Sequence, residues 1–136
     1  MGYNIRREYR RWLADKVVAG IRRTRLDDKL GGFILKVLHF NAPWGLVIHA
    51  AKAPRNEAIF SLIALTVALG LYIYVGGCFL SDAEIQLGAG EFNVVDPYIQ
   101  LFDQPVNKQS RYDFTIFGAA LAYTLVLSFL HLRGIL

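Results

Sequence analysis

The sequence has three histidines and one cysteine, residue types that can ligate a metal or react: His39, His49, His131 and Cys78. Histidines in membranes ligate haem iron or the magnesium of chlorophyll, and His131 lies near the end of an apolar stretch where either group would fit. His39 and His49 fall on separate predicted helices and form no obvious pair. A single cysteine excludes an intrachain disulfide and any cysteine-based zinc or iron–sulfur site. We therefore expect polar interfacial contacts from the histidines, inert packing from Cys78, and no metal or cofactor held by the chain itself.

The strongest chemical signal is the absence of charge from two long apolar stretches. Neither 58–81 nor 114–132 contains Asp, Glu, Lys or Arg. Proton and ion carriers need ionisable groups inside the membrane, so a comparison with the carboxylate-bearing rotor of ATP synthases fails. The sequence also lacks a phosphate-binding glycine loop, a serine nucleophile elbow and a zinc-protease motif. We expect a protein that is not an enzyme.

Both stretches predict membrane-spanning helices. The first, 58–81, has 24 residues without a charge, whereas about 18 already indicate a transmembrane segment. At about 1.5 Å per residue it reaches about 36 Å, enough to cross the hydrocarbon core with some tilt. The mean hydropathy is +0.34, and the residues outside the two stretches are too dispersed for a large soluble core. We predict an all-α membrane protein with two transmembrane helices in a hairpin, 56–81 and 114–132.

The residues before the first predicted span indicate helices that lie outside the membrane. Residues 1–30 are Arg-rich and free of proline, which predicts a basic amphipathic helix. In 31–55, apolar residues recur at helical spacing in two short runs separated by Asn-Ala-Pro at 41–43. We expect two short interfacial helices there, with Trp44 at headgroup depth. The alternative, a third and broken span over 31–51, is disfavoured by the lysine, proline and histidines within it.

Basic residues are concentrated before the first predicted span. Twelve Lys or Arg and four acids precede residue 56, whereas 82–113 carries six acids and two basic residues. Basic segments stay on the side of the membrane where the protein is made. We therefore expect the N-terminus and the C-terminal tail, 133–136, in the matrix or cytoplasm. The acidic loop 82–113 is expected in the opposite compartment.

Two sets of residues are candidates for binding. Basic and aromatic residues beside a membrane attract anionic lipid, cardiolipin included, or an acidic face of a partner protein, and no nucleic-acid-binding motif accompanies them here. This set is Arg6, Arg7, Arg10, Arg11, Arg22, Arg23, Trp44 and Arg55. Small residues four positions apart let helices approach closely within lipid, although Ala and Gly are common in any span. This second set is Ala64, Ala68, Gly118 and Ala122.

A basic arm, two uncharged spans and an acidic loop resemble, in architecture, the accessory (supernumerary) subunits of mitochondrial respiratory-chain and ATP synthase complexes. No family motif carries the resemblance. It implies a non-catalytic protein of the mitochondrial inner membrane that supports assembly and stability through helix packing and contacts with lipid. Its partners would be other subunits of a large complex. The alternatives are a stand-alone membrane-shaping or lipid-binding protein and a pigment-binding photosystem or antenna subunit.

Overall fold

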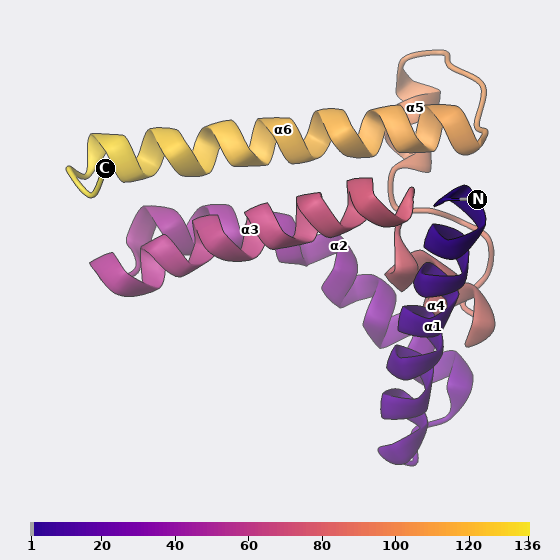
Figure 1. The fold of residues 1–136 in the computed structure, drawn as a ribbon. Coiled ribbons are helices and arrows are strands. Elements are labelled where there is room, and N and C mark those ends of the chain that lie inside the picture. The colour runs from indigo at the N-terminus through magenta and orange to yellow at the C-terminus, as the bar shows by residue number, and fades with distance from the viewer. Residues whose placement is uncertain (1) are drawn as a thin grey trace. The chain divides into compact units, whose positions relative to one another are not determined.

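The computed structural model describes the backbone of residues 2–136 and the side chains of residues 5–136. These residues form helices and no strand, so the all-helical class is confirmed (Figure 1). The helices are α1 (Gly2–Arg23), α2 (Asp28–Lys52), α3 (Arg55–Val75), α4 (Phe79–Gln86), α5 (Asp96–Leu101) and α6 (Lys108–Leu132). The chain divides into two compact units. Unit 1 comprises Met1–Phe40 with Leu71–Val94, and unit 2 comprises Asn41–Gly70 with Val95–Leu136.

Among residues 2–136, three helices, not two, are long and apolar enough to cross a membrane: α2, α3 and α6. The predicted number was wrong because 31–55 does not form two short helices. Pro43 lies inside α2, and the helix continues through it. A proline within a helix costs about 3 kcal/mol. Val47 and Ala50, one and two turns further on, are buried in an apolar cluster, and this burial offsets the cost.

The first predicted span ends at Val75 rather than at residue 81 because two glycines follow it. Gly76 has φ 68° and Gly77 φ 150°, a conformation that residues with a side chain rarely adopt. Gly77 also lies against Arg10 so closely that an added β-carbon would be 2.6 Å from the Arg10 Nη1. The turn after α3 therefore requires glycine, and it places Cys78 beyond the end of the helix.

Unit 1 is built on an apolar contact between α1 and α4. Its buried residues are Ala14, Val18, Ala83 and Leu87. Polar contacts flank them: the Arg10 Nε donates to Asp82 Oδ2 at 2.8 Å, and the Gln86 Nε2 donates to Asp15 Oδ1 at 3.1 Å. An ion pair of this length cannot join residues on opposite faces of a hydrocarbon core about 30 Å thick. The expectation that the basic arm and the acidic loop lie in opposite compartments therefore disagrees with this packing.

Unit 2 packs around an apolar cluster to which α2, α3 and α6 all contribute. Its buried residues are Val47, Ala50, Ala58, Leu65, Ala122, Val126 and Leu130. Those on α6 are four positions apart and share one face, and α6 runs alongside α3 in Figure 1. After α6, Arg133 donates to the carbonyl oxygens of Ala50 and Ala53, each at 2.6 Å. These bonds satisfy carbonyls left without helical partners at the end of α2.

The loop between the two predicted spans contains two short helices, α4 and α5. α6 begins earlier than the predicted span, at Lys108, because Asn107 caps it. The Asn107 side chain accepts from the Ser110 amide at 2.9 Å, and the Asn107 amide donates to the Ser110 hydroxyl at 3.0 Å. This is a capping box.

Candidate functional site

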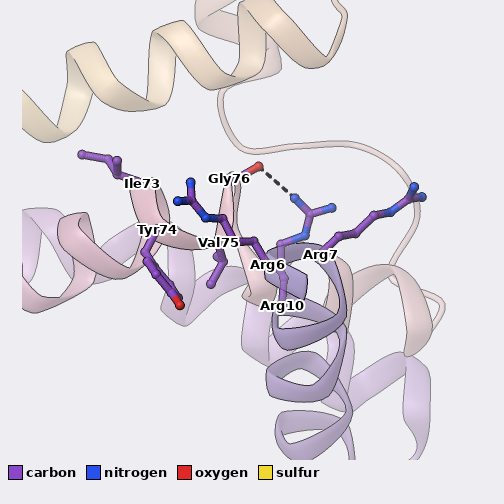
Figure 2. Close-up of a pocket in the computed structure, with 7 residues that line it drawn as sticks. All are labelled: Arg6, Arg7, Arg10, Ile73, Tyr74, Val75 and Gly76. Atoms are coloured by element: carbon purple, nitrogen blue, oxygen red, sulfur yellow. Dashed lines mark hydrogen bonds between the residues drawn. The ribbon is translucent and has the colours of Figure 1, made fainter. Parts of the chain in front are cut away.

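The arginines of α1 and the last turn of α3 line a cavity of about 150 Å³ within unit 1 (Figure 2). Its walls are Arg6, Arg7, Arg10, Ile73, Tyr74, Val75 and Gly76. Arg6 and Arg10 are four residues apart, so they project from the same face of α1. Three of the predicted binding residues therefore meet beside the end of an apolar helix.

Arg10 is held by two contacts and positions α1. Besides its bond to Asp82, its Nη1 donates to the Gly76 carbonyl oxygen at 2.9 Å, the dashed line in Figure 2. Its side chain is 23% exposed. Charge-assisted bonds are roughly twice as strong as neutral ones. Arg10 thus fastens α1 to the turn that follows α3.

Arg6 and Arg7 are exposed and present guanidinium groups to a ligand. The Arg6 guanidinium carbon lies 5.5 Å from the centre of the Tyr74 ring, within the range of a cation–π contact. Figure 2 shows Arg6 reaching toward Tyr74 while Arg7 extends to the other side. Guanidinium groups bind phosphate oxygens with paired N–H donors. The cavity therefore has the chemistry to hold a phosphate group against an aromatic and aliphatic wall.

The other predicted binding residues lie outside this cavity. Arg22 forms a paired contact with Asp28, Nε to Oδ1 at 3.2 Å and Nη2 to Oδ2 at 2.9 Å, which connects the end of α1 to the start of α2. The remaining ones are exposed: Arg11, Arg23, Trp44 and Arg55. Their binding of lipid or partner stays a prediction.

The predicted small-residue faces divide between the interior and the surface of the chain. Ala122 is buried in the cluster of unit 2, whereas Ala68 and Gly118 are exposed and Ala64 is half-buried. The face of α3 that enters the cluster carries Ala58 and Leu65 instead. If Ala68 and Gly118 pack against a helix, that helix belongs to another chain.

Unit 1 also contains a buried polar cluster that the sequence did not reveal. Glu84 is 3% exposed, and its Oε1 lies 2.7 Å from the His39 Nδ1. The other ring nitrogen, His39 Nε2, is 3.3 Å from the Cys78 sulfur. Lys36 Nζ is 4.0 Å from Glu84 Oε2. A buried carboxylate requires such partners, because an unpaired one is strongly destabilising.

Lys36 shows how a charge is accommodated within α2. Its Nζ donates to the carbonyl oxygens of Ala89 at 3.0 Å and Phe92 at 2.7 Å. Lysines in membrane helices are tolerated when backbone carbonyls or acids satisfy them. The segment around Ala89 can approach α2 closely because residue 32 is glycine: an added β-carbon there would lie 2.9 Å from the β-carbon of Ala89. The lysine and histidine that disfavoured a third span are thus bonded inside unit 1.

Cys78 contacts a histidine, a pairing that the sequence did not indicate: its sulfur lies 3.3 Å from His39 Nε2. Burial raises the pKa of its thiol. The hydrogen bond and positive charge of His39, together with hydrogen bonds from Ser81, lower this pKa by more than burial raises it. The net pKa lies below the ordinary value for cysteine. The other two histidines are separate from this cluster: His49 Nε2 lies 3.7 Å from Glu57 Oε2, and His131 is exposed.

No similarity identifies the chain. The sequence matches no protein-family model, and no curated protein or solved structure is significantly similar to it. Across residues 2–136, no three His, Cys, Asp or Glu side chains are placed to hold a metal ion together. The function must therefore be inferred from the geometry of the chain itself.

Proposed function

We propose that this chain is a non-catalytic membrane protein with three spans, which serves as a subunit of a larger membrane assembly. One observation carries the proposal: most residues of the three proposed spans are not buried by the rest of the chain. In the apolar windows of α2, α3 and α6, 17%, 22% and 17% of the residues are buried. The remaining surface requires lipid or the helices of partner chains.

The interior of unit 2 supports a packing role. Its buried cluster is entirely apolar, and the buried polar side chain next to it on α3 is the uncharged Ser61. Transport paths and proton relays are built from ionisable groups within the membrane. The buried acid of this unit, Asp96, lies on α5 and is paired with Arg111. The spans of this unit therefore offer apolar surfaces to other helices, which is the property of a structural subunit.

The mitochondrial inner membrane and a respiratory-chain or ATP synthase complex are the location and assembly that we propose. The architectural resemblance and the Arg-rich arm support them. The arm lies in the matrix on this proposal, because basic segments stay on the side of synthesis.

Native electrophoresis in a mild detergent tests the subunit role. We expect the chain to migrate with a large assembly, whose other chains mass spectrometry then identifies. A Gly118→Leu variant should release the chain, because this exposed glycine lies on the predicted packing face and an added β-carbon would meet no other segment of the chain within 4 Å. Gly20→Leu, at an equally open position on α1, is the matched control. Migration of the unaltered chain as a free small oligomer would contradict the proposal.

The arginine cavity favours a second function, retention of an anionic phospholipid. It lies at the end of α3, and therefore at the depth of the headgroups when α3 crosses the bilayer. Polar donors and an aromatic ring meet there, as headgroup binding requires. This function is compatible with the first, since lipids fill the surfaces between subunits.

A double Arg6→Gln, Arg7→Gln variant should retain less anionic phospholipid. Each basic residue near an anionic surface contributes about 1 kcal/mol, so binding to vesicles that contain cardiolipin should fall about tenfold or more. Flotation with such vesicles and with neutral phosphatidylcholine vesicles measures the effect. Arg22→Gln, Arg23→Gln is the matched control, because it removes the same charge from the other end of α1. Equal losses in the two variants would show that net charge alone, and not the cavity, binds the lipid.

A further inference from the structure

The buried polar cluster of unit 1 has the arrangement of an activated nucleophile. Cys78 supplies the sulfur, His39 Nε2 lies within hydrogen-bond reach at 3.3 Å, and Glu84 Oε1 contacts the other ring nitrogen at 2.7 Å. A nucleophile, a base and a third group that orients the base are the general signature of covalent chemistry at a side chain. Three separate segments supply these groups: α2, the turn after α3, and α4. Cys78 is therefore part of a hydrogen-bonded relay with His39 and Glu84, and is not an isolated cysteine.

The surrounding charges are arranged to support this relay. Lys36 Nζ faces the far oxygen of Glu84 at 4.0 Å. Glu84 Oε1 contacts His39 Nδ1, which leaves Nε2 facing the sulfur to exchange a proton with it. The neighbouring acid on α4, Asp82, is engaged by Arg10 of α1. It therefore does not compete for the histidine.

We propose that Cys78 accepts a fatty acyl group from an acyl thioester and carries it as an S-acyl cysteine. The inference goes beyond the subunit role and rests only on the membrane placement of α3. Cys78 lies three residues after Val75, the last residue of α3, and is half-buried. A long-chain acyl thioester keeps its chain in the hydrocarbon and its polar carrier in water, so its carbonyl lies at the membrane boundary. The sulfur and the carbonyl therefore occupy the same depth.

The reaction is a thioester exchange. The Cys78 sulfur gives its proton to His39 Nε2 and attacks the acyl carbonyl carbon, forming a new carbon–sulfur bond. The bond from that carbon to the carrier sulfur breaks, and the carrier thiolate takes the proton back from His39. One thiol and one thioester are consumed and one of each is formed, so no oxidant or reductant is needed. The acyl chain then lies in the bilayer beside α3.

Reaction of the whole chain in lipid nanodiscs with a long-chain acyl-coenzyme A tests the proposal. The chain has one cysteine, so every thiol modification reports on Cys78. We expect a mass increase of one acyl group that hydroxylamine removes. The rate should fall at least tenfold in His39→Gln and less in Glu84→Gln, while His49→Gln, the matched control in unit 2, reacts as the unaltered chain does. Acylation of His39→Gln at the unaltered rate would overturn the proposal, and so would no acylation of the unaltered chain.

Alkylation with iodoacetamide across a range of pH distinguishes loss of the relay from loss of folding. In the unaltered chain the rate should reach its plateau at a lower pH than that of a free cysteine, because the thiolate is already formed there. In His39→Gln the plateau should move to higher pH. The double variant His39→Gln, Glu84→Gln also removes the buried charge and should show the same profile. In denaturant all variants should alkylate alike, and a plateau unchanged by His39→Gln would contradict the relay even if the subunit role holds.

Discussion

An Asp96→Ala variant should release α5 from α6, with a loss of about 3–5 kcal/mol in the local stability of unit 2. Asp96 is 5% exposed. Its two carboxylate oxygens accept from Arg111, Nε to Oδ1 and Nη2 to Oδ2, each at 2.8 Å. Truncation removes the carboxylate that accepts both of these Arg111 N–H groups. Removal of one member of a buried pair is strongly destabilising for this reason.

Hydrogen exchange of the full chain in detergent measures this effect. Amides of 96–104 should lose most of their protection in Asp96→Ala, while those of 116–130 keep theirs. Asp103→Asn is the matched control, because it removes an exposed acid from the same loop and asparagine tolerates the left-handed backbone there, φ 53°. The double variant Asp96→Asn, Arg111→Gln should recover part of the protection, since both charges are gone. Equal protection in Asp96→Ala and Asp103→Asn would show that Ile99 and the other apolar contacts alone hold α5.

Local patterns in the sequence predicted the helices well. The charge-free run before residue 81 corresponds to α3, and the proline-free basic segment corresponds to α1, because helical periodicity and apolar length depend on neighbouring residues. The break predicted at Pro43 was wrong for a tertiary reason. The proline weakens only the helix that contains it, whereas Val47 and Ala50 are buried in a cluster with residues of α3 and of α6, and α6 lies far away in the sequence. A propensity taken from a short window does not include that burial.

The sequence could not predict the contacts of the site that join residues far apart in the chain. Arg6, Arg7 and Arg10 were identified as binding residues, but the α3 wall of their cavity is more than 60 residues away in the chain. His39, Cys78 and Glu84 were considered one by one, as a polar contact, a packing residue and a loop acid. The sequence alone does not indicate which acid of the loop contacts which histidine. Only the docking of α1 and α2 against residues 78–92 selects these partners.

If α2, α3 and α6 all cross the membrane, as we propose, the N-terminal helix and the C-terminus are expected on opposite faces. α1 packs on α4, and α4 follows the C-terminal end of α3, so α1 lies on the side where α3 ends. The chain must then cross in α2 to reach the start of α3, and cross again in α6. Eight basic residues precede α2, from Arg6 to Arg25, so we expect this side in the matrix or cytoplasm. On the three-span proposal the C-terminus is expected in the opposite compartment, whereas a two-span hairpin would return it to the matrix.

Single cysteines in a Cys78→Ser background should show this directly with a membrane-impermeant maleimide on sealed vesicles. We expect Thr24→Cys and Gln104→Cys to be labelled from one face, and Asn56→Cys and Leu136→Cys from the other. All four positions are exposed in the chain. A two-span hairpin predicts a different result: residues 24, 56 and 136 would be labelled from one face, and residue 104 from the other. The effect is all-or-none, since moving the basic segment across the bilayer is opposed at each of its arginines. Labelling of residue 24 together with 136 would mean that Arg10 and Asp82 do not meet in the membrane-inserted protein, and the arginine cavity between α1 and α3 would be lost with that pair.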